Sequence, residues 1–275
     1  MNPRSKGIVV ALYGFAIFWG GVILVPFFWL AALSVKTRID AFSVPPKLFF
    51  EPTFVAYSEI LRDSKFLSAV LNSVIISVSA VTLSLLVAVP AAYALRNMVG
   101  PFRRNSTLVL LLLRMVPGMV YLLPYFVLYD RIGLLDTHIG LILVHLIFNV
   151  PLIIWMLLPI WAAIPDDLGE AARIDGATLL QTLFLIDLPL LKGGILASSI
   201  LAFIFSWNEF LFALILGRRE VITLPVAIVN FLAFEGTEWG KIAAASMFIV
   251  LPAIIFGFFV RRYMIAGMTG GAVKG

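Results

Sequence analysis

The acidic residues of this chain are concentrated in one short segment, and they are the first candidates for chemistry. The chain has fifteen Asp and Glu residues, and five of them lie between Ile164 and Leu191: Asp166, Asp167, Glu170, Asp175 and Asp187. No H-E-x-x-H or G-x-S-x-G pattern accompanies them, and no carboxylates are paired within the apolar segments. The sequence therefore does not indicate an enzyme, and these carboxylates require another explanation.

The spacing within this segment predicts two short helices joined by a turn. Pro165 suits a first helical turn, and the acidic residues after it favour the positive end of a helix. Gly176 can end that helix in a left-handed conformation, and Thr178 is a candidate start for a second one. An exposed ridge of small residues, suited to docking in a groove on another protein, would then comprise Leu168, Ala171, Ala172 and Asp175. On physical grounds alone, an ordinary amphipathic connecting loop remains the alternative.

The residues that commonly bind metals or act as nucleophiles are scarce. The chain has no cysteine, which excludes disulfides and thiolate chemistry. His138 and His145 lie seven residues apart, but a metal site needs further ligands at a matching depth. We therefore expect packing or interfacial roles for both histidines, and no bound metal.

The composition indicates that lipid surrounds much of the chain. Of the 275 residues, 62% are hydrophobic and 13% are charged, whereas soluble domains carry roughly 25% charged residues. The net charge is +5, but no basic cluster with interleaved aromatic residues indicates nucleic-acid binding. The uncharged run from Gly7 to Val35 exceeds the roughly 7–15 residues of a signal peptide core, so it is expected to be an uncleaved membrane helix.

The apolar segments predict an all-α integral membrane protein with six transmembrane helices. A spanning helix needs about 20 mostly apolar residues, and six segments qualify: 10–33, 68–95, 105–129, 138–160, 193–217 and 242–262. The run from Val221 to Phe234 is too short to span and is expected to be interfacial or re-entrant. Six spans place both termini on one side, and the basic turn at 96–104 favours the cytoplasmic side.

The segment 164–191 resembles the EAA loop of ABC-importer permeases. Glu170-Ala171-Ala172 is followed at the family's spacing by Gly176, Ile186 and Leu188-Pro189, with no position missing. The stretch "LSAVLNSVIIS" at 67–77 resembles the start of the family's conserved-fold region. The stretches "EAARIDGA" at 170–177, "WNEF" at 207–210 and "GMTGGAVKG" at 267–275 are similar to the carbohydrate-uptake branch, in particular to the shorter permease of maltose-type importers. This resemblance implies a type I importer fold with a coupling helix, in which the ATPase contacts are Glu170, Ala171, Ala172, Asp175 and Gly176.

The same resemblance implies the domain organisation and the partners. Residues 1–66 would form the first span and an extracytoplasmic loop, 67–263 the core, and 264–275 a cytoplasmic tail whose Gly270, Gly271 and Lys274 reach the ATPase. The expected partners are a second, non-identical permease, two ATP-binding subunits, an extracytoplasmic binding protein, a carbohydrate and membrane lipid. The chain has no G-x-x-x-x-G-K-[ST] pattern, so ATP and Mg²⁺ are expected on the partner subunits and no cofactor on this chain.

Four residues within the apolar segments are candidates for the translocation path. Ionisable groups within a membrane are costly and are functional candidates by default, and Arg114 and Glu209 are the clearest cases. Trp207, Asn208 and Glu209 combine an aromatic ring, an amide and a carboxylate, which suit a sugar; hydrogen bonding between helices or contact with the partner permease is the alternative. Arg114 is expected to pair with backbone carbonyls or a partner residue rather than with Glu209, which lies at a different depth.

An ion-coupled secondary transporter is the remaining rival. Such proteins often contain repeats and coupling-ion residues at mid-membrane. No convincing repeat is visible in this sequence, and the charged segment would remain unexplained.

Overall fold

The computed structural model describes residues 3–233 and 236–269 and is almost wholly helical. The chain divides into two compact units, one formed by residues 1–67 and 227–250, the other by 68–226 and 251–275. Two short antiparallel strands, β1 (Leu232–Ala233) and β2 (Gly236–Thr237), pair with Leu232 opposite Thr237. These strands cover only four residues, and the other elements are helices, so the predicted all-α class is confirmed.

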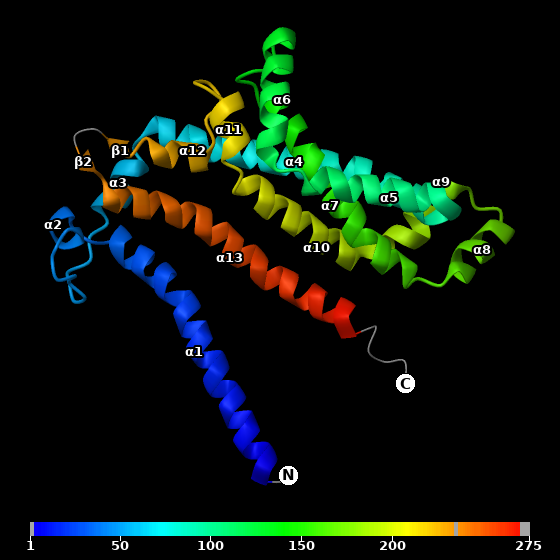
Figure 1. The fold of residues 1–275 in the computed structure, drawn as a ribbon, viewed down its shortest axis with the longest axis horizontal. Coiled ribbons are helices and arrows are strands. Elements are labelled where there is room, and N and C mark those ends of the chain that lie inside the picture. Colours follow the sequence, from blue (N-terminus) through cyan, green and yellow to red (C-terminus); the bar gives the residue numbers. More distant parts are fainter. Residues whose placement is uncertain (1–2, 234–235, 270–275) are drawn as a thin grey trace. The chain divides into compact units, whose positions relative to one another are not determined.

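The long helices are arranged along the chain as follows (Figure 1). They are α1 (Pro3–Ser34), α4 (Ser64–Asn97), α5 (Gly100–Met115), α6 (Gly118–Ile132), α7 (His138–Ala162), α10 (Leu188–Trp207) and α13 (Trp239–Thr269). Shorter helices connect them: α2 (Arg38–Ala41), α3 (Val55–Ile60), α8 (Asp166–Ile174), α9 (Leu179–Thr182), the π-helix η1 (Leu183–Asp187), α11 (Leu211–Leu216) and α12 (Leu224–Val229). The segment 221–234 thus holds only the six-residue helix α12 and part of a hairpin, as expected for a segment too short to span.

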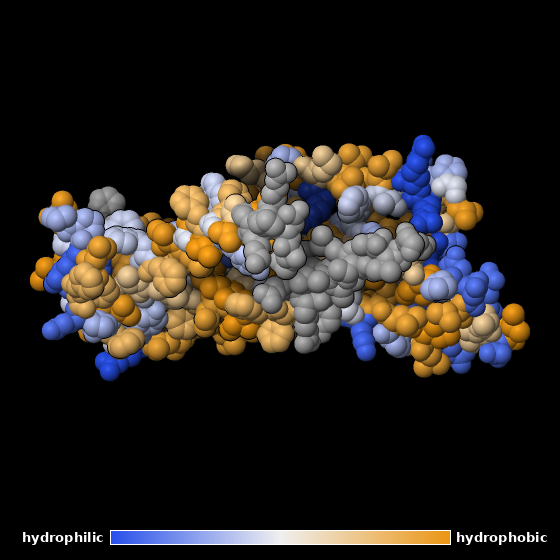
Figure 2. Space-filling model, turned by 90° about the horizontal axis from the view of Figure 1, so that it is seen from below, coloured by the Kyte–Doolittle hydropathy of each residue, from blue (hydrophilic) through white to orange (hydrophobic). Residues whose placement is uncertain are grey.

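Within the described residues, five helical segments are long and apolar enough to cross a membrane, and the pair α5–α6 makes a sixth if its two helices count together. Apolar residues cover much of the coloured surface seen in Figure 2, and most of the hydrophilic residues in this view lie toward its left and right ends. Four of the six predicted spans are confirmed as continuous helices: 10–33, 68–95, 138–160 and 242–262.

The prediction of one continuous helix over 105–129 was wrong. Helices α5 and α6 meet at an angle of 88°, and the break lies at Val116 and Pro117. Proline clashes with a helical conformation of the residue before it, and Val116 accordingly has an extended ψ of 126°. Pro117 itself has a ψ of 135°, so two consecutive extended residues separate the two helices.

The prediction of one span over 193–217 was wrong in its second half. Helix α10 ends at Trp207, and α11 starts at Leu211. The Asn208 amide donates to the Ile204 carbonyl over 2.7 Å, so the side chain takes part in closing the helix. The polar residues between the two helices, which hydropathy averaging hides, end the span.

Helix α7 is the central helix of the unit formed by 68–226 and 251–275. It packs against α10 and α5, and half of its most apolar 18-residue stretch is buried. Leu157 and Trp161 of α7 are fully buried. A Cβ on Gly194 of α10 would lie 2.7 Å from Cδ1 of Ile160, so a larger residue there would have to displace the end of the Ile160 side chain; small residues are common where membrane helices pack.

Candidate functional site

The segment 164–191 forms the predicted helix–turn–helix. Helix α8 starts directly after Pro165 and carries Asp166 and Asp167 in its first turn. Gly176 has a φ of +86°, and the N–H of Ala177 bonds back to the Ala172 carbonyl over 2.9 Å. The predicted left-handed conformation at Gly176 is therefore confirmed.

The predicted second helix is α9, and its start is held by a capping box. The Thr178 hydroxyl accepts from the N–H of Gln181 over 3.3 Å, and the Gln181 side chain accepts from the N–H of Thr178 over 2.8 Å. These two reciprocal bonds satisfy backbone groups that a four-residue helix cannot bond internally.

The exposed ridge on α8 differs from the prediction at one position. Ala171 and Asp175 are exposed as expected, but Ala172 is buried on the side of α8 that packs against α9. Sequence reasoning missed the large apolar side chains exposed beside the ridge, namely Ile174 at 86%, Leu180 at 67% and Leu179 at 59%. Exposed apolar patches of this kind mark interaction surfaces. The exposed residues Leu168, Ala171, Ile174, Asp175, Leu179 and Leu180 together form the candidate for the predicted docking, and they are called the docking surface below.

Arg96, in the last turn of α4, holds this segment against the spanning helices. Its Nη1 donates to Asp187 Oδ1 over 3.1 Å, and its Nη2 donates to Asp166 Oδ1 over 2.7 Å. The Arg96 and Asp187 side chains are 14% and 4% exposed, whereas that of Asp166 is 84% exposed. Among the described residues, Asp187 Oδ2 has no hydrogen-bond partner. Arg96 is therefore the one hydrogen-bond partner of the buried Asp187 carboxylate among the described residues.

A cavity of about 310 Å³ lies where both breaks in the spanning segments meet. Arg114 and Glu209, two of the four predicted path residues, line it together with Gly118, His145, Phe148, Asn149, Phe205, Ser206, Leu211 and Phe212. The cavity therefore combines a cation, a carboxylate, an amide and aromatic rings, which are groups that complement the hydroxyls and C–H faces of a sugar.

Arg114 and Glu209 share this cavity without pairing. Arg114 Nη1 donates to the Phe148 carbonyl over 3.0 Å, and its Cζ lies 5.1 Å from the centre of the Phe205 ring. The expected pairing with a backbone carbonyl is confirmed. The Glu209 carboxylate accepts from the N–H groups of Phe212 and Ala213 over 2.8 and 3.0 Å, so it satisfies the open start of α11.

The other two predicted path residues lie elsewhere. Trp207 is buried and stacks on Phe203, with 5.6 Å between ring centres. Asn208 is exposed and bonds to its own helix. Sequence reasoning missed Asn149, which donates to Ser206 Oγ over 2.8 Å at the cavity wall.

The two histidines lie in different surroundings. His145 lines the cavity, and its Nδ1 is 2.6 Å from the Leu141 carbonyl. His138 Nε2 is 2.9 Å from Asn72 Oδ1. Within residues 3–233 and 236–269, no group of three His, Cys, Asp or Glu residues is arranged to hold a metal ion.

Asp136 joins two loops at the opposite end of the spanning helices from α8. It lies between α6 and α7 with a φ of +57°. Its carboxylate accepts from four consecutive backbone N–H groups, those of Arg218, Arg219, Glu220 and Val221. Burial opposes ionisation, but these four donors together lower the pKa of Asp136 from 3.8 to about 2.

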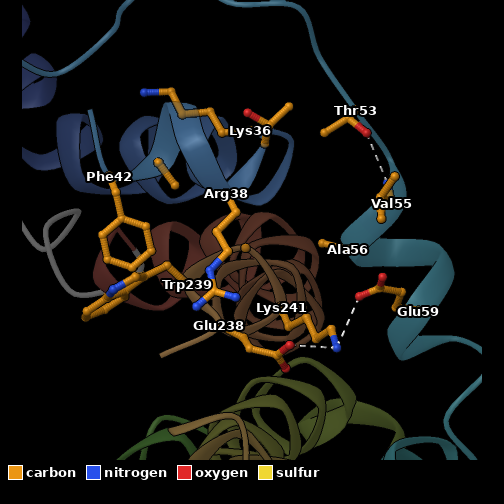
Figure 3. Close-up of a pocket in the computed structure, with 13 residues that line it drawn as sticks. Lys36, Arg38, Phe42, Thr53, Val55, Ala56, Glu59, Glu238, Trp239 and Lys241 are labelled. Carbon is orange, nitrogen blue, oxygen red and sulfur yellow. Dashed lines mark hydrogen bonds and ion pairs between the residues drawn. The ribbon is translucent and has the colours of Figure 1, made fainter. Parts of the chain in front are cut away.

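A second charged pocket, of about 370 Å³, lies within the unit formed by 1–67 and 227–250. Figure 3 shows Lys241 between Glu59 and Glu238, at 3.1 and 3.0 Å. Trp239 and Phe42 supply aromatic surface at the same pocket. No sequence pattern singled out this group.

The predicted tail contacts Gly270, Gly271 and Lys274 lie outside the described residues.

Comparisons with known proteins agree on one family. The sequence model described as "Binding-protein-dependent transport system inner membrane component" matches residues 80–269. The chain is 38% identical over 261 residues to the trehalose transport system permease protein SugB of Mycobacterium tuberculosis, covering 93% of this chain and 94% of that protein. It is 32% identical to the trehalose/maltose transport system permease protein MalG of Thermococcus litoralis, covering 94% and 95%. A chain of a bacterial ABC transporter that imports alginate has the same fold, with a TM-score of 0.78 at 24% identity over 96% of this chain and 98% of that one.

Proposed function

Because the chain belongs to the family of inner membrane components of binding-protein-dependent transport systems, we propose that it is one of two permeases in an ATP-driven carbohydrate importer. The second permease is a different chain, two ATP-binding subunits dock on the cytoplasmic side, and an extracytoplasmic binding protein delivers the sugar. ATP and Mg²⁺ bind to the ATP-binding subunits. Relatives named for trehalose and maltose transport support a carbohydrate substrate.

The observation that carries this proposal is the docking surface on α8 and α9. It displays large apolar side chains outside the spanning helices, it has the full EAA spacing, and it is tied through Arg96 to α4 and through η1 to α10. A force applied to α8 therefore reaches two spanning helices directly. Glu170, Ala171, Ala172, Asp175 and Gly176 form or position this surface.

The orientation that fits this role places both termini and α8 in the cytoplasm. The basic turn at 96–104 lies at the same end of the helices as α8, in agreement with the excess of Lys and Arg in cytoplasmic loops. Asp136 and the loop at 218–221 then face the binding protein.

The cavity that Arg114 and Glu209 line is proposed as part of the sugar path. Both groups already have intrachain hydrogen bonds, so they would contact the sugar with their remaining donors and acceptors. Trp207 does not line the cavity, and it contributes to the path by packing, through its stacking on Phe203.

Cysteine cross-linking in the assembled importer tests the proposal. Ile174→Cys, on the docking surface, is expected to cross-link to an ATP-binding subunit. Ile39→Cys is the matched control, because Ile39 is 84% exposed on α2 outside the docking surface; it is expected to give no such product. Labelling of Ile174→Cys by an impermeant reagent added outside intact cells would contradict both the orientation and the docking role.

A further inference from the structure

A surface pocket of about 500 Å³ lies between α5 and α7 at the end of the spanning helices nearest α8. Helix α5 starts there, three residues after α4 ends, and α7 ends there just before α8. The pocket has a basic rim, Arg103 and Arg104, and an apolar wall that includes Leu108, Trp155, Leu158 and Pro159.

The two arginines of this rim are exposed and unpaired within the part of the chain that the structure describes. No ion pair or side-chain hydrogen bond there includes either guanidinium group. Arg96, a few residues earlier, differs sharply because two carboxylates hold it. Both arginines line the pocket, and no acidic residue is part of its lining. The pocket is therefore suited to an anion, and arginine matches the geometry of phosphate oxygens.

The apolar wall of the pocket offers a small anion no contacts beyond those to the basic rim, so the pocket also complements hydrocarbon. Trp155 is 47% exposed on α7, in the position of the aromatic residues that gather at membrane interfaces. From Leu108 the exposed apolar surface continues along α5 through Val109 and Leu112, which are 54% and 59% exposed. A ligand that fits both parts has a phosphate at one end and hydrocarbon at the other.

We propose that this pocket binds an anionic phospholipid. Arg103 and Arg104 hold the phosphate, and the first part of an acyl chain lies against Leu108 and Trp155. Basic pockets between spanning helices are suited to anionic headgroups. The leaflet, which is the cytoplasmic one, rests on the orientation proposed above, but the binding itself does not depend on the transport function.

Native mass spectrometry of the assembled importer, with added phosphatidylglycerol or phosphatidylcholine, tests the proposal. One basic residue near an anionic lipid is worth about fivefold in affinity, so two are worth roughly 25-fold. The pair Arg103→Gln and Arg104→Gln is expected to weaken phosphatidylglycerol binding by that factor and to leave phosphatidylcholine binding unchanged. Each single substitution is expected to cost about fivefold, which keeps the proposal testable if the double variant fails to assemble.

The matched control is the pair Arg62→Gln and Arg131→Gln, which removes the same charge from exposed positions outside the pocket. It is expected to retain phosphatidylglycerol binding. Equal phosphatidylglycerol binding by the Arg103/Arg104 variants and the unmodified importer would overturn the proposal. Displacement of the lipid by glycerol phosphate at equal concentration would assign the pocket to a free anion instead. Loss of the ATP-binding subunits with unchanged lipid binding would assign the two arginines to a protein contact.

Discussion

Gly176 gives the most direct test of the docking segment. Its φ is +86°, and a Cβ there would meet no atom within 4 Å, so a substitution is strained by its backbone conformation and not by a clash. A β-branched residue carries a strain of roughly 1–2 kcal/mol or more. We expect Gly176→Val to weaken ATPase docking and coupling more than Gly176→Ala, measured by co-purification and by sugar-stimulated ATP hydrolysis in vesicles. Gly176→Asn is the control, because asparagine tolerates a positive φ, and normal coupling by Gly176→Val would show that the turn has no role.

Asp136 makes the stability of the chain depend on pH. Its pKa is lowered to about 2 in the folded protein, below its ordinary value of 3.8, so the unfolded state takes up the proton first. The carboxylate therefore stabilises the fold fully above about pH 4, and this contribution is lost as the pH falls from about 4 through 2. Asp136→Asn keeps the size and tolerates the φ of +57°, but it removes the charge.

We accordingly expect Asp136→Asn to lower the melting temperature in detergent at pH 6, and the difference from the unmodified chain to fall to about half at pH 3. A constant difference between the two proteins at both pH values would contradict the assignment.

Gly176 and Thr178 were predictable because their roles depend on neighbours in the sequence. The role of Asp136 was not, because its hydrogen-bond donors lie more than eighty residues away.

Helix α4 is tied to η1 and α8 by Arg96, and the two ion pairs that do this should differ in strength. The Asp187 side chain is 4% exposed and that of Asp166 is 84% exposed. Removing one member of a buried pair leaves an uncompensated charge and costs about 3–5 kcal/mol, whereas exposed pairs contribute about 0–1 kcal/mol. We expect Arg96→Ala to lower the melting temperature strongly and Asp166→Ala to change it little.

A double substitution separates this ion pair from general loss of packing. Asp187→Asn removes the buried charge, so it should restore part of the stability when it is added to Arg96→Ala. Additive losses in a double-mutant cycle would show that the two residues do not interact energetically.

The helices themselves were predictable to the extent that hydropathy alone defines them. Long apolar runs predicted α1, α4, α7 and α13, with every predicted end within seven residues of the observed one. The breaks at Pro117 and Asn208 were missed, because averaging over about 20 residues hides two or three residues that end a helix. The cavity of Arg114 and Glu209 is formed by those two breaks, so its geometry could not be predicted from apolarity.

The complete importer should need this chain for transport and its partners for ATP hydrolysis. No phosphate-binding loop pattern is present in the 275 residues, so the purified chain is expected to have no ATPase activity. Activity should appear only when the ATP-binding subunits are added, and it should be stimulated by the sugar-loaded binding protein. The measurement is phosphate release by each subunit alone and by the reconstituted assembly. Sustained ATP turnover by this chain alone would be incompatible with the proposed division of roles.

The family was predictable because the motif 170–189 is local and complete. The sugar was not, because the residues that line the cavity come from five separate helices and a loop. Those residue types suit many polyhydroxylated ligands. Their positions become informative only when the helices are packed.

The bend between α5 and α6 also determines how the chain can be made. At about 1.5 Å per residue, α5 with 16 residues and α6 with 15 are each shorter than the roughly 30 Å of hydrocarbon in a bilayer, and α5 carries Arg114. Neither helix is a good insertion signal when it first leaves the ribosome. The carbonyl that Arg114 binds belongs to Phe148 of α7, which is synthesised later. We therefore expect the third span to reach its final place only after the fourth has entered the membrane, so that the order of biogenesis differs from the order of the sequence.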